Sequence, residues 1–401
     1  MDITIALYSH DSVGLGHARR NRALAYALAE RLPALTGGTV GGLLIAGHPD
    51  ASRDPLPEGW DWLVLPGMTR TRGGYGARRL AMDASPLRDL RSATIDAALT
   101  ALHPDLFIAD RHPFGIDGEL RPVLENLRAR GTATVLGLRE VLDTPRVAAA
   151  EWDALGGAEH VASYLDAIWV YGDPHVYDPR RTGELPPALS AKAATTGYLA
   201  HGRPAARLAH PDRSSPKPPP PYVLTVLGGG SDGAELARLA AVARLPEGHR
   251  HLLVTGPQMP EQDITGIREL AATSEDTTVV RSAPDVPELI AEAAAVVCMG
   301  GYNTMAEVMA TDTPALVVPR NRRRQEQPRR ALALAAAGAV ETCDPASVTS
   351  TDITNWWSRA VTGRTDRSHI HLDGLDVVAH LAARLLPATV PAHSEVLHHV
   401  G

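Results

Sequence analysis

A glycine-rich turn between residues 298 and 307 carries groups suited to holding a diphosphate. It reads Cys-Met-Gly-Gly-Tyr-Asn-Thr-Met-Ala-Glu and follows an apolar run that predicts a strand. Glycine pairs let a backbone bend sharply, and a helix beginning at Asn303 or Thr304 would direct free N–H groups at an anion. We therefore expect Gly300, Gly301, Asn303 and Thr304 to contact phosphate.

Glu307, one helical turn later, admits two interpretations. Its carboxylate could accept hydrogen bonds from the two hydroxyls of a ribose. Thr304-x-x-Glu307 also fits a capping box, in which the glutamate only satisfies a backbone N–H group at the start of the helix. Both remain open from the sequence.

His17 is the side chain best suited to removing a proton. It closes the segment Ser-His-Asp-Ser-Val-Gly-Leu-Gly-His after the first predicted strand, and Gly16 allows close approach of the backbone to a ligand. An imidazole pKa of ~6.5 suits proton transfer near neutrality. Asp110, after another predicted strand, is the second candidate base, and Asp11 is the third. A turn in which His17 merely covers the helix is an equally simple interpretation.

Two further loops of the second half follow predicted strands. Gly229, Gly230 and Ser231 lie in a Gly-Gly-Gly-Ser-Asp-Gly turn that could bind an anion or simply pack a strand against a helix. Glu326 and Gln327 supply the carboxylate and amide that commonly recognise sugar hydroxyls. The neighbouring arginines form either a rim that suits phosphate or a solvated charge run.

The elements around these loops alternate between short β-rich runs and amphipathic stretches, a pattern typical of parallel α/β sheets. The predicted strands of the first half are 3–8, 42–46, 62–65, 106–109, 133–138 and 167–171, with helices at 17–31, 86–102 and 118–130. Those of the second half are 223–227, 252–255, 278–281, 295–299 and 315–318. Ligands of such sheets bind beyond the carboxyl ends of the strands, where the candidate residues fall. Residues 70–79 form either an acceptor lid or an ordinary loop.

The chain of 401 residues is long enough for two domains. We expect an N-terminal Rossmann-like domain at 1–205, a proline-rich linker at 206–221, a C-terminal Rossmann-like domain at 222–385 and a tail at 386–401. The last helix could pack back on the first domain. If the domains close face to face, their loops line one cleft.

Composition excludes several classes of protein. The net charge of −7 argues against general nucleic-acid binding, and two cysteines provide no disulfide framework. No signal peptide or apolar run of ~18 residues is evident, so we expect a cytoplasmic protein. We expect no metal and no other cofactor, because no Asp-x-Asp pair is present to hold a cation against a diphosphate. His369, His371 and Asp373 have metal-compatible side chains but are expected at the surface.

At these segments the chain resembles GT-B glycosyltransferases related to the peptidoglycan lipid II synthase, an N-acetylglucosaminyltransferase. It is most similar to bacterial predicted glycosyltransferases that begin Tyr-Ser-His-Asp-x-x-Gly-Leu-Gly-His-x-Arg-Arg-Asn, as residues 8–21 do. The resemblance spans most of the chain and is densest at 3–25 and 278–339. It implies the GT-B fold, with two Rossmann-like domains facing a cleft that binds a nucleotide sugar.

The resemblance also implies roles for individual residues. Gly300, Gly301, Asn303 and Thr304 would lie against the donor diphosphate, and Glu307 would bind the ribose. Gly229, Gly230 and Ser231 match a loop beside the phosphates and sugar, and Glu326 and Gln327 match the pair that reads sugar hydroxyls. The backbone near Ala283 matches the segment that recognises the nucleobase, usually uracil. His17 matches a histidine proposed as the base.

Three departures from the family pattern limit this transfer of roles. Met299 stands where the wider superfamily has a histidine that contacts phosphate. The arginine that follows the interdomain segment of the lipid II synthase is missing, although His201 or Arg203 could replace it. The hydrophobic loops that bind a lipid-linked acceptor have no clear counterpart.

The leading hypothesis is inverting, metal-independent transfer of a sugar, such as N-acetylglucosamine, from a UDP-sugar to a hydroxyl or amine of a small-molecule acceptor. Three alternatives use the same site. They are hydrolysis of the UDP-sugar, 2-epimerisation of the sugar, and nucleotide-sugar binding without catalysis.

Overall fold

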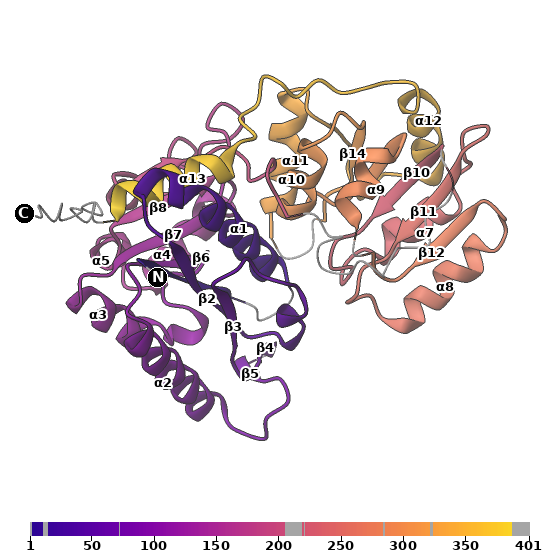
Figure 1. Ribbon diagram of the computed structural model, residues 1–401. Helices are drawn as coiled ribbons and strands as arrows, with labels where there is room; N and C mark the ends of the chain where they lie inside the picture. Colours follow the sequence, from indigo (N-terminus) through magenta and orange to yellow (C-terminus); the bar gives the residue numbers. More distant parts are fainter. Residues whose placement is uncertain are drawn as a thin grey trace, which may run out of the picture.

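The computed structural model describes residues 2–10, 15–71, 73–204, 219, 221–283, 285–320 and 324–386. These form two lobes, each built around a parallel β-sheet with helices on both faces (Figure 1). The predicted linker and tail fall almost entirely outside the described residues. In the described ranges, no helix combines the length and apolar character needed to cross a bilayer.

The first lobe contains a seven-stranded sheet in the order β3-β2-β1-β6-β7-β8-β9. Its strands are β1 (Ile3–Tyr8), β2 (Val40–Ala46), β3 (Trp60–Val64), β6 (Leu106–Asp110), β7 (Ala133–Arg139), β8 (Ala167–Tyr171) and β9 (Ala193–Thr195). The helices are α1 (Gly16–Thr36), α2 (Ala84–Leu102), α3 (Arg121–Ala129), α4 (Pro145–Ala154), α5 (Ala158–Ser163) and α6 (Pro187–Ser190). All pairs are parallel, and β1 is buried along its whole length because helices cover both faces.

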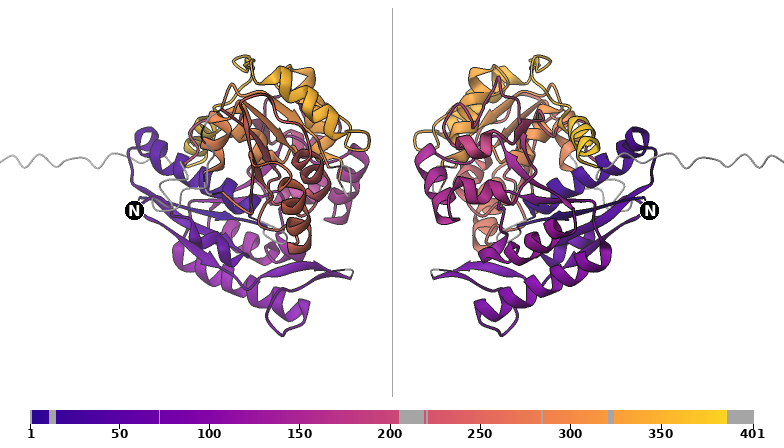
Figure 2. Two further views of the ribbon diagram at one scale, coloured as in Figure 1. Left: turned by 90° about the vertical axis from the view of Figure 1, so that its right-hand side faces the viewer. Right: turned by 90° about the vertical axis from the view of Figure 1, so that its left-hand side faces the viewer.

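A hairpin lies between β3 and α2, where the sequence predicted a lid or a loop. Its strands are β4 (Met68–Thr71) and β5 (Gly74–Ala77), which pair antiparallel. The hairpin projects past the edge of the first lobe (purple in Figure 2). It is therefore an ordered two-stranded element over the residues that the structure describes.

The second lobe contains a six-stranded parallel sheet in the order β12-β11-β10-β13-β14-β15. Its strands are β10 (Tyr222–Val226), β11 (Arg250–Val254), β12 (Thr277–Val280), β13 (Ala295–Cys298), β14 (Ala315–Val317) and β15 (Glu341–Thr342). The helices are α7 (Ala234–Ala241), α8 (Glu261–Ala271), α9 (Val286–Glu292), α10 (Tyr302–Met309), α11 (Glu326–Ala336) and α12 (Ser350–Ala360). Two short 3₁₀ helices, η1 (Pro49–Arg53) and η2 (Ile116–Gly118), complete the elements before the last helix.

The last helix, α13 (Gly374–Leu385), returns to the first lobe and lies against α1 (Figure 1). The segment leading to α13 runs antiparallel to the end of the first lobe, with Leu199 bridged to Asp373. Tyr198 N donates to His371 O at 2.8 Å, and Gly374 N donates to Tyr198 O at 3.0 Å. The two stretches of chain that run between the lobes are thus joined to each other by backbone hydrogen bonds.

Every strand predicted from an apolar run is present, with ends shifted by no more than two residues. The sequence analysis missed the hairpin, β9 and β15, all of which are short. Such elements carry too few residues to show a period of two.

Candidate active site

The candidate residues gather at equivalent places in the two sheets. In the first sheet, the strand order changes direction between β1 and β6. Asp110 is the last residue of β6, and His17 lies in the first turn of α1, which follows β1. In the second sheet, the change falls between β10 and β13, and the loops after them carry the two glycine turns. Ligands of open α/β sheets bind at such switch points.

A cavity of about 160 Å³ lies between the two glycine turns of the second lobe. Its lining combines backbone of both turns with a few polar side chains: Leu227, Gly228, Gly229, Gly230, Ser231, Asp232, Gln258, Met299, Gly301, Thr304, Arg320 and Gln327. The structure thus brings together six residues predicted from sequence to contact the donor, namely Gly229, Gly230, Ser231, Gly301, Thr304 and Gln327. Gly300, Asn303 and Glu326 lie close by in the chain but do not line this cavity. A second cavity of about 570 Å³ shares Ser231, Asp232, Met299 and Arg320 with it.

Two of these glycines are required by the backbone. Gly300 has φ of 79°, and a Cβ atom there would lie 2.8 Å from Val317 Cγ1. Gly230 has φ of 85°, and a Cβ atom there would lie 2.2 Å from Thr255 O. Only glycine adopts this conformation in so little space.

The capping-box interpretation of Glu307 is wrong. Helix α10 begins at Tyr302 with Gly301 as its N-cap, one residue earlier than the sequence predicted, so Thr304 lies inside the helix. No side chain caps this helix. The glycine pair allows the helix to start directly after the turn, which removes the position that Thr304 would have needed.

Glu307 instead makes ion pairs with two arginines. Its Oε1 lies 2.6 Å from Arg19 Nη2 of the first lobe and 3.6 Å from Arg203 Nη1. Oε2 is buried and has no hydrogen-bond partner among the described residues. One oxygen of this carboxylate therefore retains its capacity to accept a hydrogen bond.

Arg203, one of the two proposed replacements for the family arginine, reaches the glycine turn. Its Nη2 donates to Asn303 Oδ1 at 3.1 Å. His201 instead pairs with Asp373 at 2.8 Å and is half exposed. Arg203 is thus the one of the two that lies beside the predicted diphosphate residues.

His17 and Asp110 form a dyad. His17 Nδ1 lies 3.1 Å from Asp110 Oδ2, and Arg20 Nη2 donates to both carboxylate oxygens at 2.6 and 2.7 Å. An ionised carboxylate only accepts hydrogen bonds, so the contact with Asp110 favours the tautomer with the proton on Nδ1, whereas Arg20 Nη2, which only donates, lies 3.2 Å from the same nitrogen. Burial raises the pKa of Asp110, but Arg20 and His17 lower it by more than burial raises it. The resulting pKa is well below the usual range.

Other imidazoles surround this dyad. The rings of His10 and His112 lie 4.0 Å apart, and His10 lies 5.9 Å from His17. Tyr75 of the hairpin places its hydroxyl 3.2 Å from His10 Nε2. Burial lowers the pKa of His10 to about 3 and the pKa of His17 below its ordinary value, although Asp110 opposes the shift at His17. The cluster is therefore neutral at physiological pH.

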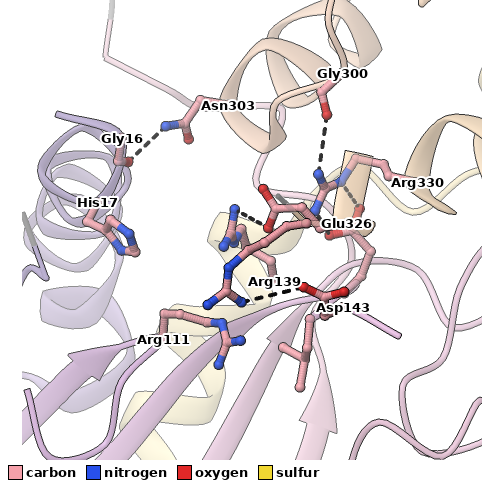
Figure 3. Close-up of polar contacts among 12 residues, drawn as sticks. Gly16, His17, Arg111, Arg139, Asp143, Gly300, Asn303, Glu326 and Arg330 are labelled. Carbon is pink, nitrogen blue, oxygen red and sulfur yellow. Dashed lines mark hydrogen bonds and ion pairs between the residues drawn. The ribbon is translucent and has the colours of Figure 1, made fainter. Parts of the chain in front are cut away.

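The two lobes meet directly at the predicted site (Figure 3). Asn303 Nδ2 donates to Gly16 O at 2.8 Å, which joins the glycine turn of the second lobe to the histidine turn of the first. Gly16 thus contacts the turn predicted to hold diphosphate. Both cavities, in contrast, are lined by second-lobe residues alone.

Glu326 and Gln327, predicted from sequence as sugar-reading residues, begin α11. Glu326 Oε2 lies 2.8 Å from Arg139 Nη1, at the end of β7 in the first lobe. Gln327 Oε1 accepts from Arg320 N at 3.2 Å. Arg320 also pairs with Asp232 at 2.8 Å, and its buried Nε has no hydrogen-bond partner among the described residues.

The remaining candidates lie apart from this cluster or outside the description. Ala283 follows β12, where it packs against the apolar core and does not line either cavity. Asp11 lies outside the described residues. His369 Nε2 contacts Ala337 O, and no cluster of three or more metal-ligating side chains occurs in the part of the chain that the structure describes.

Sequence reasoning missed most of the charged residues at the interface. These are Arg19, Arg20, Arg111, Arg139, Glu140, Asp143, Glu151, Arg324 and Arg330. Two signals were available: Arg20 lies one helical turn after His17, and Arg139 and Glu140 directly follow a predicted strand. Which partner each would find depends on how the lobes dock, which no local pattern encodes.

Known proteins match this chain in part of its sequence and in its fold. Residues 223–366 match the glycosyltransferase family 28 C-terminal domain. Over 102 residues the chain is 36% identical to the UDP-N-acetylglucosamine–N-acetylmuramyl-(pentapeptide) pyrophosphoryl-undecaprenol N-acetylglucosamine transferase of Paramagnetospirillum magneticum. This match covers 25% of the chain and 28% of that relative, so it spans less than a third of the relative's length.

Solved structures share the fold across nearly the whole chain. MurG of Acinetobacter baumannii matches with a TM-score of 0.52 and 14% identity, covering 97% of this chain and 96% of that one. The glycotransferase of kitacinnamycin matches with a TM-score of 0.57 and 16% identity, covering 96% and 99%. Residues 223–366 are thus similar to the glycosyltransferase family 28 C-terminal domain, and the chain shares the GT-B fold of these structures.

Proposed function

We propose that the protein is a glycosyltransferase that moves a sugar from a nucleoside diphosphate to a small-molecule acceptor. One observation carries this proposal. The His17–Asp110 dyad at the switch point of one sheet faces, through the contact of Gly16 with Asn303, the glycine turns at the switch point of the other. A base on one side and an anion cradle on the other are what sugar transfer with an anionic leaving group needs.

In the proposed reaction, His17 is the general base. An acceptor hydroxyl attacks the anomeric carbon from the side opposite the diphosphate, and its proton passes to Nε2 of His17 as the bond to the leaving oxygen breaks. Asp110 holds the imidazole in the tautomer that leaves Nε2 free and stabilises the imidazolium that forms. Inversion at the anomeric carbon follows from this single displacement.

The second lobe would stabilise the departing diphosphate. Gly300 and Gly301 directly precede α10, and Asn303 and Thr304 lie in its first turn, whose N–H groups and positive dipole end favour an anion. Arg320 and Arg203 add positive charge where Met299 replaces the family histidine. We therefore propose that these guanidinium groups, rather than a metal ion, balance the diphosphate charge.

The donor proposed is a UDP-sugar, possible donors including UDP-N-acetylglucosamine, the compound in the name of the Paramagnetospirillum relative. The ribose would bind Glu307 through its unpaired Oε2, and the nucleobase would bind the backbone at Ala283. Gly229, Gly230 and Ser231 would contact phosphate and sugar, and Glu326 with Gln327 would read the sugar hydroxyls. Because Arg19 occupies Oε1 of Glu307, ribose binding requires this part of the interface to loosen.

The test is incubation of the purified protein with a panel of UDP- and dTDP-sugars, with and without a metabolite extract, followed by mass spectrometry. Transfer predicts a glycosylated product that depends on both the extract and His17. Stoichiometric release of free sugar without extract would establish hydrolysis instead. Binding without any turnover would reduce the protein to a nucleotide-sugar-binding module.

A further inference from the structure

The start of α11 and the end of β7 are joined by two reciprocal ion pairs. Arg139 Nη1 lies 2.8 Å from Glu326 Oε2, while Arg330 Nε and Nη2 donate to the two oxygens of Glu140 at 2.7 and 3.1 Å. Arg139 and Glu140 are consecutive in the first lobe, and their partners Glu326 and Arg330 lie one helical turn apart in the second lobe. Shifting the helix by one turn would bring like charges together, so these pairs fix the register of the two lobes.

The two pairs differ in their surroundings. Glu140 and Arg330 are fully buried, and Arg330 also donates to Gly300 O at 3.2 Å, so this pair is enclosed by protein. The Arg139 side chain retains 16% exposure, and its Nε has no hydrogen-bond partner among the described residues. Arg139 also lies near His17 and Arg111, as Figure 3 shows. The outer pair is therefore the more exposed of the two, and its arginine is close enough for its charge to act on His17.

We propose that Arg139 is a positioning residue for donor-sugar recognition: across the lobe interface it orients the Glu326 carboxylate toward the hydroxyls of the sugar. This inference rests on the proposed function, and specifically on Glu326 as a sugar-reading residue. Since Arg139 belongs to the first lobe, recognition of the sugar is complete only when the lobes are closed. A nucleoside diphosphate without sugar does not need this contact.

The charges around Glu326 support the same role. Burial raises the pKa of this carboxyl, but Arg139, Arg330, Arg320 and Arg111 lower it more strongly, to about 2. These groups come from β7, α11, the loop after β14 and the loop after β6, so cations face the carboxylate from every neighbouring element. Arg139 exerts the largest of these effects. The carboxylate is held ionised and accepts hydrogen bonds from sugar hydroxyls across the working pH range.

The experiment compares Arg139→Lys, Arg139→Met, Glu326→Gln and the double variant Arg139→Met/Glu326→Gln with the wild type. Calorimetry measures the affinity for UDP and for nucleotide sugars that differ at one ring hydroxyl. Arg324→Ala is the matched control, because Arg324 pairs across the interface with Glu151 at 2.7 Å and acts on Glu326 through its charge without forming an ion pair with it among the described residues.

In Arg139→Met we expect UDP affinity within about 2-fold of the wild type, and at least about 10-fold loss of the preference between sugars, as expected for a severed buried charge pair. Arg139→Lys should recover part of the preference. The double variant should resemble Glu326→Gln alone, and Arg324→Ala should keep the wild-type preference. In Arg139→Met, the affinity for the nucleotide sugar should also depend on pH in the acidic range, because the pKa of Glu326 rises when its nearest cation is removed.

Three results would overturn the inference. Arg139→Met could discriminate sugars as the wild type does, lose UDP and UDP-sugar affinity equally, or match Arg324→Ala. Failure of the proposed function would give other results than these three. The wild type would then bind no nucleotide sugar, or Glu326→Gln would keep the wild-type preference between sugars. Thermal melts confirm folding, and the charge-conserving Arg139→Lys keeps the test valid if Arg139→Met unfolds.

Discussion

The two switch points occupy equivalent positions in similar sheets but carry different chemistry. The one in the second lobe is built from backbone, with Gly230 and Gly300 at positive φ around a small cavity. The one in the first lobe is built from side chains, with three imidazoles, Asp110 and Arg20 in contact. Backbone N–H groups suit a diphosphate, which UDP- and dTDP-sugars share. Side chains suit an acceptor, which differs from enzyme to enzyme.

The largest expected effect separates chemistry from donor binding. His17→Ala should reduce turnover by about 10²–10⁴-fold, the usual contribution of a general base, while leaving donor affinity within about 2-fold. Single-turnover rates and calorimetry measure the two quantities separately. His103→Ala, at the exposed end of α2, serves as the control. Unchanged turnover would remove His17 from the mechanism and leave the first lobe without an assigned base.

The contact between the lobes can be broken at its buried centre. Glu140→Gln leaves Arg330 buried without its counter-charge, which should cost about 3–5 kcal/mol. Chemical denaturation followed by lobe-specific fluorescence measures this loss, and limited proteolysis reports opening. Glu140→Gln/Arg330→Met should recover much of the stability. If the single variant were as stable as the wild type, the lobes would not depend on this pair for docking.

Alanine substitutions at the adjacent residues Gly300 and Gly301 separate the stability of the glycine turn from its proposed binding of the donor. Gly300→Ala should lower the free energy of unfolding by about 1–3 kcal/mol, because alanine is strained at positive φ. Gly301 has φ of −63°, and a Cβ atom there would meet only Gln327 Nε2 at 4.0 Å, so Gly301→Ala should fold normally. Its methyl group would intrude on the cavity and weaken UDP binding by ~10-fold. Normal UDP affinity in Gly301→Ala would place the diphosphate elsewhere.

The pH dependence tests the electrostatics of the acceptor side. A general base acts when neutral, so kcat/KM should fall as the pH drops through the pKa of His17, which burial places below 6.5. Asp110→Asn removes a charge that raises this pKa, so the acidic limb should move to still lower pH, although the rate itself decreases. A limb that moves to higher pH would contradict the dyad. Rates measured from pH 4 to 8 distinguish these outcomes.

The smallest effect is expected at the hairpin. Tyr75→Phe removes the hydroxyl that contacts His10 Nε2 and should cost about 0.5–1.5 kcal/mol in acceptor binding or local stability. Hydrogen exchange of the hairpin and the acceptor KM measure the change. A loss as large as that of His17→Ala would instead give Tyr75 a direct part in the reaction.

The sequence predicted the donor side better than the acceptor side for a physical reason. Glycine turns between a strand and a helix are local features, so Gly229, Gly230, Gly301 and Thr304 could be placed together without knowledge of the docked lobes. The match to the family 28 domain likewise covers residues 223–366 and not the first lobe.

The acceptor side depends on contacts between distant segments. His10 follows β1, Tyr75 lies in β5 and His112 follows β6, and no spacing in the chain reveals that their side chains meet. The capping-box prediction was wrong for a related reason. Thr304-x-x-Glu307 satisfies the local pattern, but the arginines that form ion pairs with Glu307 lie more than 100 residues away in sequence. Local propensity was overridden by tertiary charge pairing.

The hydrogen-bonded pair of segments at residues 197–201 and 371–374 limits how the lobes move. A single linker would let one lobe swivel freely, whereas two tethered strands resist rotation about their common direction and leave bending as the easier motion. Any opening would separate Asn303 from Gly16 and Glu326 from Arg139. The return of α13 to the first lobe therefore acts as a second tether that favours closure of these contacts in the same alignment.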